Sequence, residues 1–195
     1  MKKIMFNDKY GLTDAVLQGR KTMTRRMVKD GTPLGNWGET EKYAKYKIGE
    51  VVAVAQSYKS IFEESLNYVI PRYHWLDDHI DKKGYANKMF VKASEMPHHI
   101  RITDIKVERL QDISEEDCLK EGIFAGELKH EQPKSYVDTY LPYGCYVPFT
   151  FHGAKQDYTS AKEAFASLIN RPGVGRKGLW EENPWVFAYS FELVK

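Results

Sequence analysis

The residues best suited to chemistry lie in one short basic segment, Gly19 to Arg26. Between Ala15 and Lys29 there are five basic residues and no acidic one. This density of charge, at the end of a short helix and along a strand, predicts a compact patch that contacts phosphate groups. A solvated strand edge that deters pairing with other chains has the same charges, so charge alone leaves both interpretations open. The residues expected to contact substrate or nucleic acid are Arg20, Thr22, Arg25 and Arg26.

Three helices are predicted around this segment. The first covers residues 13–18, because Thr13-Asp14 starts it and Gly19 suits its end. The second follows Ser114, has acids in its first turn and ends at Gly122. The third covers residues 160–169, with a capping box at its start and one apolar stripe.

Strands are predicted where apolar residues alternate. Residues 22–28 alternate with Thr22, Thr24 and Arg26 on one face, and residues 51–55 form a buried strand. The strand after Pro97 changes its buried face, so we expect a bulge near Thr103-Asp104. The last strand covers residues 185–194. Irregular insertions are expected at about 57–90 and 124–158 within a single domain of residues 1–195.

Composition limits the function classes. The chain has 195 residues, is 42% hydrophobic and 29% charged, and carries a net charge of +2, so any attraction of nucleic acid must be local. Cys118 and Cys145 are too few for a disulfide framework, and Cys118 reads as a core residue. No apolar run is long enough to span a membrane, and the N-terminus turns polar too soon for a signal peptide. A cytoplasmic protein is expected.

Two further groups have weaker patterns. The histidines around His98-His99 repeat no known metal-ligand spacing, so no metal or other cofactor is expected. The glycine-rich residues 173–178 carry basic charge as a phosphate loop does, but they follow a helix and lack the GK[ST] ending. A connector is favoured there over a substrate-facing loop.

Four segments in order along the chain carry a shared pattern. They are Gly19-Arg20-Lys21-Thr22-x-Thr24-x-Arg26, residues 47–52, residues 102–108 with 113–122, and Asn183-Pro184-Trp185-Val186. Together they resemble the ASCH-domain family of the PUA-like superfamily, and the last is similar to the ending of its longer, phage-associated members. The resemblance implies an α+β fold: a PUA-like β-barrel with about three short helices, a cleft beside the first helix, and RNA or a nucleoside as ligand.

The resemblance also implies catalytic roles. In a compact bacterial branch, the N4-acetylcytidine amidohydrolases, a lysine accepts a proton, a threonine is the nucleophile and a glutamate donates a proton. These positions fall on Lys21, Thr24 and Glu121. This chain departs from that branch by its two insertions and by Gly122, where the branch carries another residue.

Such a trio is chemically coherent. A threonine hydroxyl is a weak nucleophile until a base takes its proton, and a neutral lysine can serve as that base. An exposed lysine titrates at about 10.4, so a base at neutral pH needs its pKa lowered by about three units, or about 4 kcal/mol. Burial and neighbouring arginines lower the pKa of Lys21, whereas a carboxylate at Glu121 raises it. Lys21 and Thr24 are three residues apart, so Lys21 must lie in the turn before strand pairing begins.

The sequence therefore predicts a protein that binds RNA or a modified nucleoside in a basic cleft, with hydrolysis of an N-acyl amide such as N4-acetylcytidine as the reaction the trio would support. Two other classes stay open. One is a non-catalytic RNA-binding module, in which basic residues hold phosphates and aromatic residues stack bases. The other is a phage-type accessory protein that binds a protein partner through the aromatic insertions.

Overall fold

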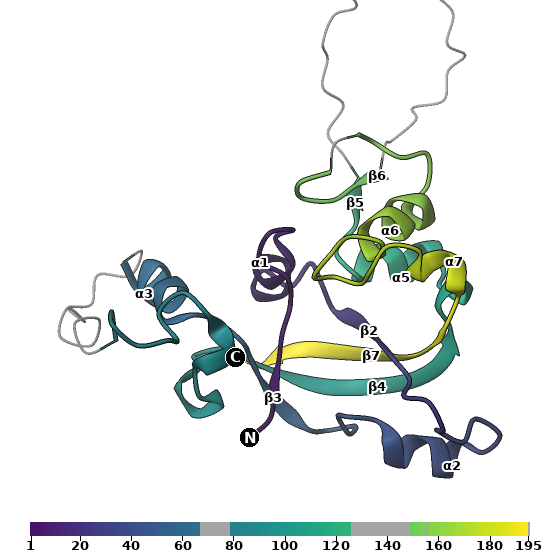
Figure 1. Ribbon diagram of the computed structural model, residues 1–195, viewed down its shortest axis with the longest axis horizontal. Helices are drawn as coiled ribbons and strands as arrows, with labels where there is room; N and C mark the ends of the chain where they lie inside the picture. Colours follow the sequence, from purple (N-terminus) through teal and green to yellow (C-terminus); the bar gives the residue numbers. More distant parts are fainter. Residues whose placement is uncertain (67–78, 126–148, 155, 195) are drawn as a thin grey trace, which may run out of the picture.

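A computed structural model describes residues 1–66, 79–125, 149–154 and 156–194. Its centre is a five-stranded mixed sheet of order β1-β3-β4-β7-β2 (Figure 1). The strands are β1 (Lys3–Ile4), β2 (Met23–Met27), β3 (Val51–Val54), β4 (His99–Arg109) and β7 (Trp185–Val194). β1 pairs parallel with β3, and the other neighbours pair antiparallel. A separate ribbon joins β5 (Phe124–Ala125) to β6 (Phe149–Thr150).

The long antiparallel pair β4–β7 follows from the alternation of apolar residues. Ile100 and Ile102 are fully buried, and burial resumes at Ile105. The register between the two strands shifts between Ile102 and Asp104. The predicted bulge is therefore confirmed: an extra residue lets the buried face continue after the period-two pattern breaks.

The three predicted helices are present as α1 (Leu12–Leu17), α5 (Glu115–Lys120) and α6 (Ala161–Ile169). The Ser114 hydroxyl accepts from the Asp117 N–H, and the Ser160 hydroxyl accepts from the Glu163 N–H, each at 3.1 Å. The Glu163 carboxylate accepts from the N–H of Thr159, one residue before the cap. Helices α2 (Trp37–Thr40), α3 (Tyr58–Leu66) and α7 (Leu179–Glu182) were not predicted. Short 3-10 turns lie at Glu41–Tyr43, Lys88–Phe90, Ala93–Glu95 and Leu110–Asp112.

The α+β class is confirmed, but no closed barrel is found among the described strands. β1 and β2 are the two edges of the sheet, and β1 has only two residues with which to pair. Where a backbone ladder would close the sheet, the side chain of Arg26 bridges the gap: its Nη2 donates to the Met5 carbonyl at 2.6 Å. In the described residues the sheet is therefore open and curved, where a barrel was expected. The gap between its two edge strands contains a cleft.

The two expected insertions are only partly described, because residues 67–78 and 126–148 lie outside the described residues. The visible part of the first holds α3, and that of the second holds β5 and β6. None of the described helices has the length and apolar character that crossing a membrane requires.

Candidate functional site

A small cleft of about 40 Å³ lies in the gap between the two sheet edges. One side is the segment that follows β1, and the other is the start of β2, with α1, α5 and α6 beside it (Figure 1). The sequence-predicted residues that line it are Lys21, Thr24, Arg25, Arg26 and Glu121. Its remaining lining is Met5, Phe6, Asn7, Leu12, Phe165, Leu168, Ile169, Gly173 and Val174.

Backbone hydrogen bonds hold Lys21 between two helix ends. The N–H groups of Arg20 and Lys21 both donate to the carbonyl of Ala15 in α1, at 2.8 and 2.9 Å. The next N–H, of Thr22, donates to the carbonyl of Lys120 in α5 at 2.9 Å. β2 begins only at Met23. Lys21 therefore lies in the turn before the strand, as predicted from its spacing to Thr24.

The Lys21 amine and the Glu121 carboxylate form a buried ion pair. Nζ donates to Oε2 of Glu121 at 2.6 Å and to the main-chain oxygen of the same residue at 2.7 Å. The two side chains are only 3% and 5% exposed. Burial lowers the pKa of Lys21; Glu121 opposes this shift, and repulsion from Arg26 and Arg25 adds to it. The amine is thus held near an acid in a setting that disfavours its charge.

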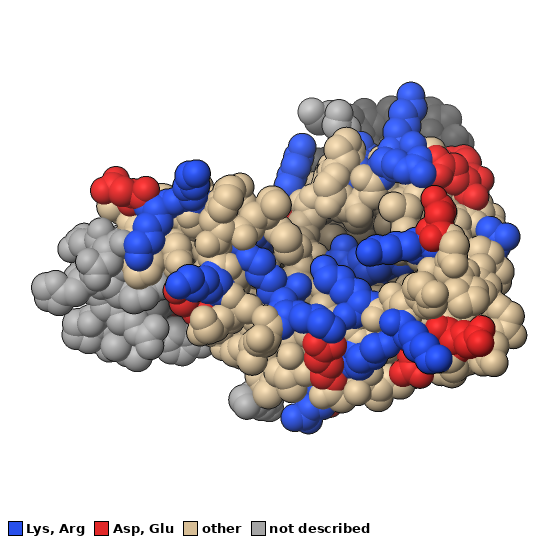
Figure 2. Space-filling view, turned by 60° about the horizontal axis from the view of Figure 1, so that its bottom comes forward, with Lys and Arg blue, Asp and Glu red and all other residues tan. Residues whose placement is uncertain are grey.

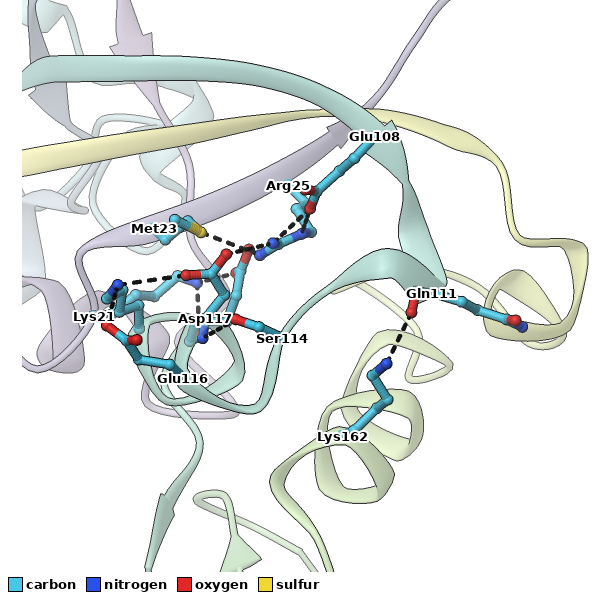
Figure 3. Close-up of polar contacts among 11 residues, drawn as sticks. Lys21, Met23, Arg25, Glu108, Gln111, Ser114, Glu116, Asp117 and Lys162 are labelled. Atoms are coloured by element: carbon cyan, nitrogen blue, oxygen red, sulfur yellow. Dashed lines mark hydrogen bonds and ion pairs between the residues drawn. The ribbon is translucent and has the colours of Figure 1, made fainter.

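Arg25 holds Glu121 from its other side. Its Nη1 donates to Oε1 of Glu121 at 3.0 Å, and its Nε and Nη2 donate to Oε1 of Glu108 at 2.9 and 2.6 Å (Figure 3). Nη2 also lies 3.3 Å from Asp117. Burial acts against the charge, but Glu121 and Glu108 outweigh it and raise the pKa of Arg25. Arg25, which the sequence predicts to contact substrate, lines the cleft and holds the Glu121 carboxylate in place.

A small residue lies between Arg25 and Glu108 on the sheet and leaves room for their contact. Arg25 pairs with Ala188 of β7, and Ala188 pairs with Lys106 of β4, two residues before Glu108. These positions share one face of the sheet, and a methyl group between them leaves room for the guanidinium to cross. Ala188 lies in the strand predicted at residues 185–194. Its position beside Arg25 depends on the strand register, which the sequence does not reveal.

The Thr24 side chain is buried, with 4% exposure, and lines the same cleft. Within the described ranges its hydroxyl has no hydrogen-bond partner. Buried hydroxyls are nearly always satisfied. This hydroxyl is therefore available to a group that enters the cleft.

Arg26 is half-buried and lines the cleft. Its Nη2 is engaged with Met5, and its guanidinium lies 5.9 Å from the ring centre of Phe6. The Lys21 amine lies 5.8 Å from the centre of the same ring, so both cations lie over the π-face of Phe6. Phe6 was not anticipated from the sequence, because a single aromatic residue near the N-terminus carries no pattern.

Two predicted contact residues lie elsewhere. Arg20 is exposed, and its Nε and Nη2 donate to Oε1 of Gln18 at 3.0 and 2.8 Å. It borders a separate hollow that also includes Tyr10 and His152. Thr22 is half-buried, does not line the cleft and takes part in backbone hydrogen bonds to Lys120 and Phe191.

Comparison of the chain with protein-family models, with curated protein sequences and with solved structures finds no match. In the described part of the chain, no group of three or more His, Cys, Asp or Glu residues is placed to hold a metal ion. The cleft brings together a buried amine, a carboxylate bonded to it and a threonine hydroxyl, which are the groups that acid–base and nucleophilic chemistry requires.

Proposed function

We propose that this protein is an ASCH-type, PUA-like protein that binds RNA or a modified nucleoside in the cleft and hydrolyses an N-acyl amide such as that of N4-acetylcytidine. One observation carries the proposal: the buried Lys21–Glu121 pair lines the same cleft as the Thr24 hydroxyl, which has no partner among the described residues. Three residues from two distant segments supply a base, an acid and a nucleophile.

The PUA-like assignment is supported by the way the sheet ends. Its edges approach closely enough for one arginine side chain to bridge them, between Arg26 and Met5. Backbone pairing between the two edge strands is what would close such a sheet into a barrel.

The 2.6 Å contact between Lys21 and Glu121 accounts for the proton transfers. Moving one proton from Nζ to Oε2 turns the ion pair into a neutral amine and a carboxylic acid, and burial of Lys21 disfavours its charged form. The amine then takes the Thr24 proton as Oγ1 attacks the acyl carbon. The acid gives its proton to the leaving nitrogen, and the C–N bond breaks. The products are a Thr24 ester, the free amine and the original ion pair.

Hydrolysis of the ester repeats the same exchange. Lys21, again neutral, takes a proton from water, the resulting hydroxide attacks the ester carbon, and the acid of Glu121 returns a proton to the threonine oxygen. Arg26 lines the cleft with further N–H groups beyond the one bound to Met5, and it is suited to bind the acyl oxygen as negative charge develops. Atoms balance as one amide and one water giving an amine and a carboxylic acid.

The test is turnover of N4-acetylcytidine, followed as release of cytidine by chromatography. Wild-type protein is compared with Lys21→Met, which removes the base and keeps an apolar stem of similar size. Lys59→Met, an exposed lysine of α3, is the matched control. We expect Lys21→Met to lower the rate by about a hundredfold or more and Lys59→Met to leave it unchanged. No release from any N-acyl nucleoside, or full activity of Lys21→Met, overturns the proposal.

One observation favours the non-catalytic alternative. Both carboxylate oxygens of Glu121 accept from cationic donors, Lys21 and Arg25, so the network is satisfied without a substrate. Under this alternative the cleft is a structural ion cluster, and RNA binds without chemical change. Salt-sensitive RNA binding with no turnover supports the alternative. The aromatic residues on which a protein-binding role was based lie largely outside the described residues.

A further inference from the structure

A second hollow lies on the other side of the Arg26–Met5 bridge and shares both residues with the cleft. It has a volume of about 240 Å³. We call it the Lys45 groove; its lining residues are Met5, Arg26, Met27, Lys29, Tyr43, Lys45, Tyr46, Phe187 and Tyr189. The proposed reaction uses none of these except Arg26.

The lining holds three cations and no acid. Lys29 and Lys45 are exposed, and neither ammonium group has a hydrogen bond or a counter-ion in the described part of the chain. Figure 2 shows Lys and Arg side chains gathered around a hollow near the middle of one face, with Asp and Glu mostly towards its edges. Such a concentration on a chain of net charge +2 is local, and phosphate is the anion that it suits.

The cations of the groove repel one another. Partial burial lowers the pKa of Lys45, and repulsion from Arg26, Lys2 and Lys29 lowers it further. Lys2 is itself paired with Glu50 at 3.0 Å, which offsets part of its charge. An anion bound between these side chains would relieve the repulsion and raise the pKa of Lys45 again.

Aromatic surface accompanies the charge. Tyr43 is 55% exposed, while Tyr46 and Tyr189 are buried beneath and pack edge to face at 5.4 Å. The backbone N–H of Lys45 donates to the Tyr189 hydroxyl at 3.0 Å, which fixes the segment that carries Tyr43 and Lys45. An exposed ring on a fixed segment beside cations is the usual platform on which a single-stranded nucleic acid stacks a base.

We infer that the Lys45 groove holds the strand of a single-stranded nucleic acid, with phosphates against Arg26, Lys29 and Lys45 and a base on Tyr43. The inference rests on the proposed function in one respect: the adjoining nucleotide is the one whose base enters the cleft. Because the groove and the cleft meet at Arg26, one strand can occupy both. A base in a duplex must leave its stack to enter such a cleft, so an unpaired strand is the form that fits.

The test measures binding and needs no turnover. A fluorescein-labelled single-stranded RNA of about twelve nucleotides, within the usual site sizes, is titrated with full-length protein at several salt concentrations and followed by anisotropy. The groove variant is Lys29→Ala/Lys45→Ala. The matched control, Lys59→Ala/Lys83→Ala, removes the same charge from exposed positions of α3 and the segment after it. Thermal unfolding confirms that both variants fold.

We expect the groove variant to bind RNA about tenfold more weakly and to lower the salt slope by about 1.4, or 0.7 for each lost phosphate contact. The control should match wild type, and Tyr43→Ala should weaken binding about fivefold or more. Single-stranded DNA of the same sequence shows which part of the strand is contacted. Equal affinity for DNA and RNA indicates contacts with the phosphodiester chain, and tighter binding of RNA indicates contacts with the ribose hydroxyl as well.

The inference is overturned if wild type binds neither strand, or if the groove and control variants lose affinity equally. If the protein binds the strand but turns over no N-acyl nucleoside, the inference about the Lys45 groove stands and the proposed reaction is wrong. If it turns over the nucleoside but binds no strand, the proposed reaction stands and the inference about the groove is wrong.

Discussion

The Lys21 amine donates to both the carboxylate and the main-chain oxygen of Glu121, a residue one hundred positions further along the chain. Two bonds to one residue fix the amine against the end of α5 in both distance and direction. Arg25 holds the second carboxylate oxygen, so the glutamate is clamped between two cations. A change at this glutamate should therefore affect both the stability of the fold and the proposed reaction.

Replacing Glu121 by Gln should destabilise the fold. Both cations are almost fully buried, and the neutral amide leaves them without their shared anion. We expect the free energy of unfolding in urea to fall by about 3 kcal/mol. Glu192→Gln, which breaks an exposed pair with Arg101, should cost about 0.5 kcal/mol or less. Equal losses in the two variants would show that the buried cluster contributes nothing special.

The proposed base gives activity a definite pH dependence. Burial lowers the pKa of Lys21 below 10.5, so the neutral amine is reached at lower pH than in the unfolded chain. Because base and acid share one proton, kcat/KM should fall as pH rises through the lowered pKa of Lys21, with a midpoint below 10.5, once the uncatalysed rate is subtracted. A rate that rises across this range, or the same fall in Lys21→Met, contradicts the role.

The same group affects stability with a known sign. Between the lowered pKa of Lys21 and 10.5, the unfolded chain binds more protons than the folded one. The contribution of Lys21 to the free energy of unfolding should therefore rise with pH across that window. The contribution can be isolated by urea unfolding of wild type and Lys21→Met at a series of pH values. The free energy of unfolding of wild type minus that of Lys21→Met should increase as pH rises through this window.

Gly122→Ala tests how tightly the cleft is built. Gly122 has φ of +103°, and an added Cβ lies 3.2 Å from Leu12 Cδ2 and 3.7 Å from Lys21 Cδ. We expect a loss of about 1–3 kcal/mol in the free energy of unfolding and a lower turnover. Gly35→Ala is the control, since its φ is not positive and no atom lies within 4 Å of its Cβ. Unchanged stability and activity in Gly122→Ala contradict the expectation.

The Cys118 thiol should be inert in the folded protein. It is fully buried, and burial together with Glu115 raises its pKa to about 12. In a Cys145→Ser background, iodoacetamide at mildly alkaline pH (about 8) should leave Cys118 unmodified, and urea should expose it to alkylation. Mass spectrometry of the intact protein checks both results. Rapid modification without urea would argue against the packing of α5.

Local patterns were sufficient for much of the fold. The helix α6 and the strand β7 follow from unbroken periodicity, and the bulge in β4 follows from a change of buried face. The turn at Lys21 follows from its spacing to Thr24. Each of these depends on residues close together in the chain, where backbone geometry alone sets the outcome.

Non-local relations could not be predicted in this way. Arg25 is one basic residue among several in its segment, and its partners Glu108 and Glu121 lie 83 and 96 residues away. Charge patterning therefore favoured an exposed contact residue where the fold has a buried one. The barrel was expected from the resemblance, whereas β1 has too few residues to close the described sheet. The Lys45 groove draws on β2, the segment before β3 and β7, which only the fold brings together.

Turnover of N4-acetylcytidine by Thr24→Val tests the central claim most directly. Valine keeps the shape of the side chain and removes only the hydroxyl, so the ion pair and the cleft stay in place. We predict cytidine release by wild type and a rate at least about a hundredfold lower for Thr24→Val, because the covalent route is lost. Cytidine release by Thr24→Val at the wild-type rate would contradict the account.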